Sequence, residues 1–445
     1  MAMQSLHERR PAQARFIALV GFCVAFVVRT YWVIKIQSPY NSLYNDMAGY
    51  SERARTIARE WGPDPDPFST FFPWGAHYFY RLEHILSGGY HNDVSVCVWN
   101  ACAASIATPF AVLIASRLTT SRGPLWLLAA VSAFWHPEIT FVGFFTSETP
   151  FNAAVVLASW AILRAVERGR GGFLVGLFCA WAFATRPQFA FTMVMCAPLV
   201  LFHKQERGRR WRLVAAAAIP LCVVVGYSAA RFHHIKGYWS LISDNGPFQR
   251  LFADTKIGLI TSHWTDKKGR YYSYGFSPPS KGPAGEMEKF DFEGYIADGP
   301  ILDKKRKELT KDMTVGQRVA RMNNNVRILF FGEPMWPEIG KADTPFRQRA
   351  QKVSKAIMRD YIRPLAWLGV IIGSLALRSQ RRSFRVALAI TVANVVTMIV
   401  AAAVYWGEPR YRVPYDAFLM ILAAIAVDLL VVRVPRWAAA TVRRR

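Results

Sequence analysis

The sequence predicts an all-α polytopic membrane protein with about ten transmembrane helices, on the basis of two observations. Hydrophobic residues make up 52% of the 445 residues, and they are gathered in long blocks. A block of roughly 18 to 22 apolar residues is long enough to cross a bilayer as a helix. The second observation is that charge alternates between the loops that join the blocks. The expected spans are 16–36, 94–116, 124–142, 147–163, 173–186, 188–202, 213–230, 364–377, 386–405 and 414–432.

The formal charge of +25 is distributed unevenly. If the chain starts inside the cell, the inner segments hold 22 Lys and Arg against 3 acidic residues, whereas 231–363 holds 24 basic and 15 acidic residues. This follows the positive-inside rule, so we expect both termini in the cytoplasm and no nucleic acid partner. The inner segments are 1–15, 117–123, 164–172, 203–212, 378–385 and 433–445.

The first span resembles a signal peptide, because arginines precede the apolar run from Phe16 to Val28. No small-residue cleavage site follows, and apolar residues resume at 31–34, so we expect an uncleaved span. The six cysteines lie in or beside apolar segments without metal-ligand spacing or a visible disulfide framework. They are typical of small core residues.

The first outer loop, 37–93, is expected to hold juxtamembrane helices. Residues Asp46 to Trp61 have a helical pattern, which the prolines of 63–67 interrupt. Aromatic clusters around Phe72 and Phe79 follow, and such clusters favour the lipid–water interface. Further along, the fifth and sixth spans are expected to form a tight hairpin broken at Arg186-Pro187.

A second, mixed outer segment, 231–363, separates spans seven and eight. Its middle, 271–299, is rich in Gly, Pro and charge and is expected to be irregular, and 302–331 is expected to be helical. The basic run 304–307 is either a solvated face or a binding site for anionic lipid headgroups. The predicted parts are therefore 1–230 with its loop 37–93, the extracytoplasmic segment 231–363, and 364–445 with its outer loop 406–413.

Charged residues near spans are costly, so each needs a physical reason. Arg29, in the outer half of the first span, either extends to the interface or contacts an anionic lipid headgroup. Asp46 is either a helix N-cap or a catalytic carboxylate, and Glu148 either stabilises the start of span four or supports chemistry. Glu138 lies in the same short outer loop as Glu148.

Arginines occupy the other outer loops. Arg186 at the hairpin tip has the geometry to hold phosphate with two donors. In the last outer loop Arg410 and Arg412 flank Tyr411, against the positive-inside bias, which indicates a bound anion unless Glu408 pairs with one of them.

An acid with arginines suits transfer from a phosphate leaving group: the carboxylate takes a proton from the acceptor, and the arginines offset the charge on the departing phosphate. Nucleotide-binding, nucleophile-elbow and zinc-protease motifs are absent from the sequence. Nothing implies a cofactor, and a divalent metal has no motif to support it beyond the adjacent His233 and His234.

The order of these motifs resembles the GT-C superfamily of membrane glycosyltransferases, which use polyprenyl-phosphate sugars. It is most similar to bacterial members related to protein O-mannosyltransferases and to the lipid A aminoarabinose transferase. The resemblance covers nearly the whole chain except 231–363. The motifs that carry it are Arg29, Asp46-x-x-x-Tyr50, Pro73-x-Gly75, His136-Pro137-Glu138, Ser147-Glu148, Thr185-Arg186-Pro187 and Glu408 to Pro414.

The resemblance implies an inverting glycosyltransferase on the outer face of the cytoplasmic membrane, with Asp46 as the general base. It implies that Arg186, Arg410 and Arg412 lie near the donor phosphate. Many relatives have a second acid beside the first, whereas here Met47 follows, so Glu148 is the candidate for the supporting role. We also expect Arg29 to contact the donor phosphate. The candidate substrate-binding residues are Tyr50, Glu138 and Tyr411.

The expected partners are the bilayer, a lipid-linked sugar donor, and an envelope glycan, lipid or protein as acceptor. A transporter or flippase of lipid-linked sugars is the alternative, and it would show inverted repeats and midplane charges, neither of which is visible. A non-catalytic envelope subunit would not need the outer acid and arginines.

Overall fold

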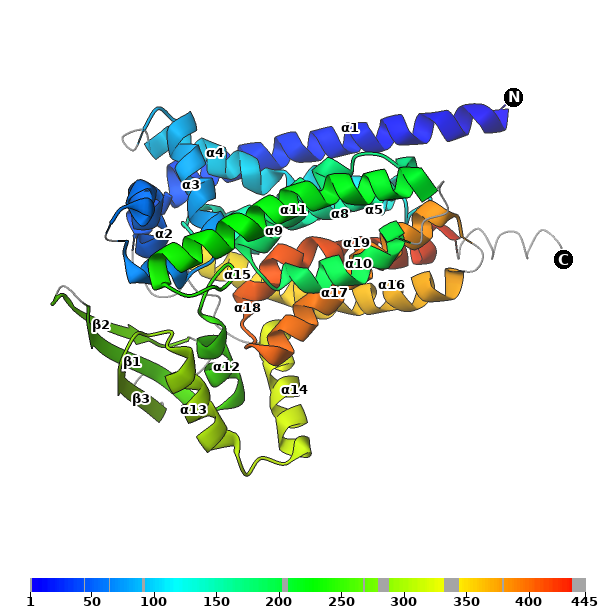
Figure 1. Ribbon diagram of the computed structural model, residues 1–445. Coiled ribbons are helices and arrows are strands. Elements are labelled where there is room, and N and C mark those ends of the chain that lie inside the picture. The colour runs from blue at the N-terminus through cyan, green and yellow to red at the C-terminus, as the bar shows by residue number, and fades with distance from the viewer. Residues whose placement is uncertain are drawn as a thin grey trace.

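The computed structural model describes residues 2–43, 45–63, 65–89, 93–201, 207–266, 269–278, 288–331, 344–377 and 380–433. It is mostly helical, and its long helices lie side by side in one bundle (Figure 1). Parts of the expected inner segments 203–212, 378–385 and 433–445 lie outside the described residues. Seven helical segments among the described residues are long and apolar enough to cross a membrane: Pro11–Asn41, Val94–Ala115, Gly123–Val142, Glu148–Arg168, Gly208–Lys236, Arg382–Val404 and Pro409–Val431.

These seven segments make the chain a multi-pass membrane protein. Two expected spans are shorter apolar helices, α9 (Gly172–Thr185) and α10 (Phe189–Leu201), which flank the expected break at Arg186-Pro187. The expected eighth span is helix α16 (Arg363–Ala376). The total of about ten therefore stays a prediction. The remaining bundle helices are α1 (Ala2–Tyr31), α4 (Asp93–Ser105), α5 (Ala107–Ala115), α6 (Gly123–Ala133), α7 (His136–Val142), α8 (Glu148–Arg168), α11 (Arg207–Lys236), α17 (Arg382–Val404) and α19 (Asp416–Val427).

Helix α8 lies at the centre of the bundle and is buried on nearly all faces. The expected inner loops 117–123 and 164–172 meet at one end of the bundle, where Arg117 and Glu167 pair at 2.7 Å. At the same end Asp428 accepts hydrogen bonds from the backbone and hydroxyl groups of Thr120 and Ser121 at 2.7–3.0 Å. These donors explain a charge inside the last span. Helices α2, α3 and the sheet lie at the opposite end (Figure 1).

The described residues of the segment 37–93 include two α-helices. Helix α2 (Asn45–Thr56) continues as a 3-10 turn to Trp61, and α3 (Trp74–Leu86) follows. Because α2 begins at Asn45, Asp46 lies within its first turn and is not the N-cap, so the N-cap interpretation is wrong. An acid in a first turn still interacts favourably with the helix dipole.

Glycine is required at position 75, where α3 packs on the end of α9. A Cβ atom there would lie 2.6 Å from the Ala184 carbonyl carbon and the Thr185 nitrogen. No side chain fits in that space, so the close approach fixes the backbone that leads into Arg186.

A buried ion pair fastens the same loop to α11. Arg231 donates to both carboxylate oxygens of Glu60 at 2.8 Å and to the Ser69 carbonyl at 2.9 Å. Burial by itself raises the pKa of Glu60, but hydrogen bonds from Arg231 and His77 outweigh it and lower this pKa to about 2.

We expect Arg231→Met to lower stability by about 3–5 kcal/mol, because it leaves Glu60 buried without its guanidinium. A melt in detergent monitored by intrinsic fluorescence measures the effect, with Arg59→Met on the exposed surface as the control. Adding Glu60→Gln should recover much of the loss. If Arg231→Met melts like wild type, the pair does not stabilise the loop.

The second outer segment contains a three-stranded sheet, ordered β2-β1-β3. Strand β1 (Ile257–Thr265) pairs antiparallel with β2 (Tyr271–Phe276) and parallel with β3 (Glu288–Glu293). The expectation that 271–299 is irregular is therefore wrong for β2 and β3. Aromatic rings alternate along β2, and Trp264 stacks on its cross-strand partner Tyr272 at 4.9 Å, so pairing outweighs the Gly and Pro content.

The expected helix 302–331 is two helices, α13 (Gly299–Thr310) and α14 (Val315–Phe331), since the chain turns between them. Helix α12 (Gly246–Asp254) and the buried rings of Phe71 and Trp406 complete a small core beneath the sheet. Helix α15 (Pro345–Ile357) leads into α16. The division of the chain into three parts stays a prediction.

Candidate active site

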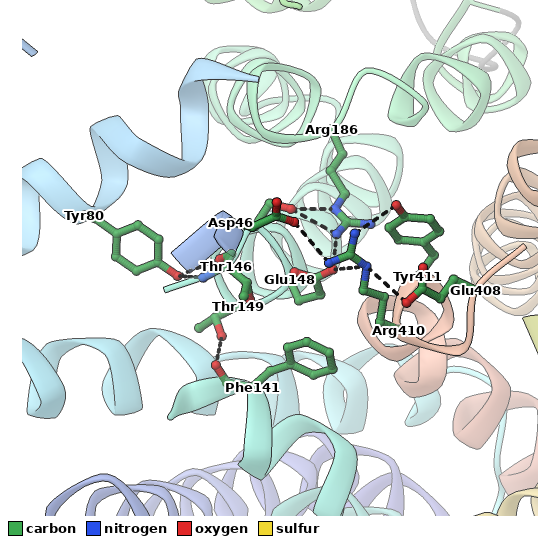
Figure 2. Close-up of polar contacts among 11 residues, drawn as sticks. Asp46, Tyr80, Phe141, Thr146, Glu148, Thr149, Arg186, Glu408, Arg410 and Tyr411 are labelled. Carbon is green, nitrogen blue, oxygen red and sulfur yellow. Dashed lines mark hydrogen bonds and ion pairs between the residues drawn. The ribbon is translucent and has the colours of Figure 1, made fainter. Parts of the chain in front are cut away.

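Four charged side chains that are far apart in sequence converge at the end of the bundle where α2 lies (Figure 2). Asp46 comes from the first turn of α2, and Glu148 from the first turn of α8. Arg186 follows the last residue of α9, and Arg410 lies on the short helix α18 (Pro409–Arg412). Each therefore stands at a helix end, where loops can bring side chains together.

Arg410 is the shared counter-charge of the cluster. Its Nη1 atom lies 3.4 Å from Asp46 Oδ2. Its Nε atom lies 3.9 Å from Glu148 Oε1 and 3.7 Å from Glu408 Oε1. One guanidinium thus contacts three carboxylates, which come from three separate parts of the chain.

Arg186 forms the second half of the cluster. It donates to a Glu148 carboxylate oxygen and to Ser147 Oγ, the latter at 2.9 and 3.2 Å. The Tyr411 ring lies close to both guanidinium groups, 5.0 Å from that of Arg186 and 4.9 Å from that of Arg410. Cation–π attraction to this ring adds to the attraction of the Glu148 carboxylate that both arginines face.

A cavity of about 370 Å³ opens onto this cluster. Part of its wall is apolar, and the rest carries the charged groups. Six of the predicted site residues line it: Asp46, Tyr50, Glu148, Arg186, Arg410 and Tyr411. Such a cavity, with convergent polar groups on an apolar wall, is typical of a small-molecule site.

The three carboxylates of the cluster differ in their surroundings: Glu148 faces the guanidinium groups of both arginines, whereas burial dominates at Asp46 and Glu408. Burial raises the pKa of Asp46, and Arg410 lowers it again in part. Burial also raises the pKa of Glu408 to about 7, with Arg410 opposing the rise and Glu148 and Asp46 adding to it. Glu408 therefore carries a proton below neutral pH, which balances the charge of the cluster.

We expect Glu408→Gln to remove a pH dependence of stability. In wild type the pKa of Glu408 is higher in the folded chain than in the unfolded chain. Its contribution to stability is therefore fully present below the unfolded-chain pKa and is lost as the pH rises to about 7. A rise of this pKa from 4.5 to about 7 corresponds to a loss of about 3 kcal/mol in the free energy of unfolding. Apparent melting temperatures between acidic and neutral pH measure it. The melting temperature of the variant relative to wild type should increase with pH and then level off. A difference that stays constant with pH would contradict the raised pKa of Glu408.

The remaining three predicted site residues do not join the cluster. Arg29 is fully buried, pairs with Glu138 at 2.8 Å, and donates to the carbonyls of Ser132 and Ala133, so neither interpretation offered for Arg29 is seen. Arg412 pairs with Asp416 at 2.8 Å. Neither pair is among the residues that line the cavity.

The sequence interpretation missed three contributors to this site. Glu408 was considered only as a salt-bridge partner, and Ser147 only as part of a motif. The loop before α12 also lines the cavity through Ile242, Ser243 and Asn245. Ile242 has a φ of 43°, which is rare for a β-branched residue and marks strain at a cavity wall. Sequence carries no signal for such a backbone.

No three His, Cys, Asp or Glu side chains in the described residues are grouped so that they could hold a metal ion. The pair His233 and His234 has other neighbours, since His233 stacks on Trp239 and His234 on Trp61.

Comparison with protein-family models and with curated proteins finds no match. Among solved structures the chain is similar to the Archaeoglobus fulgidus oligosaccharyltransferase in the apo form, with a TM-score of 0.50 and 12% identity over 96% of this chain and 52% of the other. The oligosaccharyltransferase AglB of that organism, in complex with an inhibitory peptide and a dolichol-phosphate, gives 0.49 and 13% over 95% and 51%.

The chain thus spans about half the length of these structures. At such low identity, the likeness to the apo enzyme is evidence of fold alone. The fold of this chain is thus similar to that of the archaeal oligosaccharyltransferase.

Proposed function

We propose that the chain is an inverting glycosyltransferase, which moves a sugar from a polyprenyl-phosphate donor to an acceptor in the cell envelope. The observation that carries the proposal is the cluster of Asp46, Arg186 and Arg410 on one cavity. The transferase fold supports it. The membrane is the cytoplasmic one, both termini lie in the cytoplasm, and the cavity opens on the outer side.

In the proposed reaction, Asp46 takes the proton of the acceptor hydroxyl or amine. The acceptor oxygen or nitrogen bonds to the anomeric carbon as the bond from that carbon to the phosphate oxygen breaks on the opposite face. Polyprenyl phosphate leaves with the bonding electrons, and Arg186 and Arg410 offset its charge. Glu148 holds Arg186 in place, and Tyr50 and Tyr411 line the sugar's path.

Reconstitution in vesicles with a labelled polyprenyl-phosphate sugar tests the proposal. A new covalent product on an envelope acceptor is the expected result. Movement of the label across the bilayer without a product would overturn it in favour of transport. Mass spectrometry of envelope glycans, lipids and proteins from cells that lack the chain identifies the sugar and the acceptor.

A further inference from the structure

Helix α14 leaves the bundle along much of its length. Its C-terminal part packs against the outer ends of α17 and α18, where Leu329 and Asn325 are buried. Gly407 lies so close that a Cβ atom would stand 1.7 Å from the Asn325 carbonyl oxygen, so this end is tightly held. The N-terminal half extends past the edge of the bundle and runs across the direction of the spans (Figure 1).

The extended half keeps an apolar stripe. Val315, Val319 and Met322 are 78%, 58% and 41% exposed. At about 100° per residue they share one face of the helix. Leu329, which is buried against the bundle, lies along nearly the same face. The apolar face of α14 therefore packs on protein at its C-terminal end, and no described residue covers the same face at its N-terminal end.

The charge of α14 indicates what covers this stripe. The helix contains three arginines and no acidic residue. Arg318 and Arg321 donate to the carbonyl oxygens of Thr310 and Asp254, whereas Arg327 is exposed. The exposed Lys304 and Lys307 on neighbouring α13 belong to the basic run that the sequence left open. A basic helix with one apolar face is typical of a helix that lies in the headgroup region of a bilayer.

The position of α14 also fits a bilayer as the surface that covers the stripe. Helix α17 has the length and hydropathy of a membrane span, and α14 is fastened to its outer end. Phe331 and Val404, near this junction, are also exposed. Helix α14 is attached by its C-terminal part to the end of a span, and its other half runs across the span direction. That half therefore extends over the bilayer that surrounds the bundle.

We propose that α14 is an interfacial helix, with Val315, Val319 and Met322 inserted into the leaflet beside the cavity and the exposed Arg327 among the lipid headgroups. It would hold the sheet at a set height above the membrane. This inference is independent of the proposed transferase activity.

Fluorescent labelling of single cysteines in the full chain tests it. The background replaces Cys23, Cys102 and Cys222 with serine, because the other three cysteines are buried. The dye is attached after Val319→Cys or, on the opposite face, after Gln317→Cys. Vesicles of phosphatidylcholine, with or without phosphatidylglycerol, contain a lipid that bears a quencher near the headgroup.

We expect roughly two- to threefold more quenching at 319 than at 317, since interfacial helices bury their apolar face by about 5–10 Å. Phosphatidylglycerol should increase the difference. Equal quenching at both positions overturns the proposal. A blue-shifted dye at 319 that lipid does not quench also overturns it, because protein, such as a second copy of the chain, would then cover the stripe.

Discussion

Asp46→Asn is expected to lower the rate of sugar transfer by about 10²–10⁴ while the protein still folds. The carboxylate lies at the cavity and is only 12% exposed, and burial raises its pKa toward the range where a general base works well. Asparagine keeps the shape of the side chain but cannot take the proton. Single-turnover transfer from a labelled lipid-linked sugar measures the loss.

The pH profile gives a second measure. A base acts when ionised, so the wild-type rate should rise with pH through the raised pKa of Asp46, and this limb should disappear in the variant. Glu52→Gln, an exposed acid on the same helix, is the matched control. Wild-type transfer by Asp46→Asn, with a normal melting temperature, would remove Asp46 from the mechanism.

Arg410→Met is expected to lower the rate by about 10²–10³, in the manner of a lost electrostatic group at a transition state. Its guanidinium is the one shared by Asp46, Glu148 and Glu408. Removing it also removes an interaction that lowers the pKa of Asp46. That pKa should rise further, so the rising limb of the pH profile should move to higher pH and the loss should be greatest in acid.

Arg410→Lys separates the two effects. Lysine keeps the charge, so the pH limb should stay near its wild-type position, but it loses the planar fork and part of the rate. Arg385→Met, exposed at the far end of α17, is the control for removal of an arginine. If Arg410→Met raises only the KM for the acceptor and leaves the pH profile unchanged, Arg410 does not act on the donor phosphate or on Asp46.

The membrane part of the fold could be predicted from the sequence because each span carries its own signal, a long apolar block. The hairpin break at Arg186-Pro187 was predictable for a similar reason, since proline ends a helix locally. The sheet was not. Strand β2 is held by Trp264 and other residues outside it, and a composition rich in Gly and Pro concealed that pairing.

Part of the candidate site was likewise predictable from the sequence, and part was not. Hydropathy and loop charge indicated that Asp46, Glu148, Arg186 and Arg410 all stand at helix ends on one side of the bundle, and the structure brings them together. The same signal also made Arg29 and Arg412 candidates for the donor phosphate, yet they pair with Glu138 and Asp416.

Sequence alone thus predicted at which end of the bundle each charge stands, because hydropathy and loop charge are read from short stretches of chain. The partner of each charge depended on the rotation of every helix about its axis and on the residues that neighbouring helices present. Those are set by packing between segments hundreds of residues apart, as with Asp46 and Arg410. Neither residue carries a local mark of the other, so their contact became visible only in the folded chain.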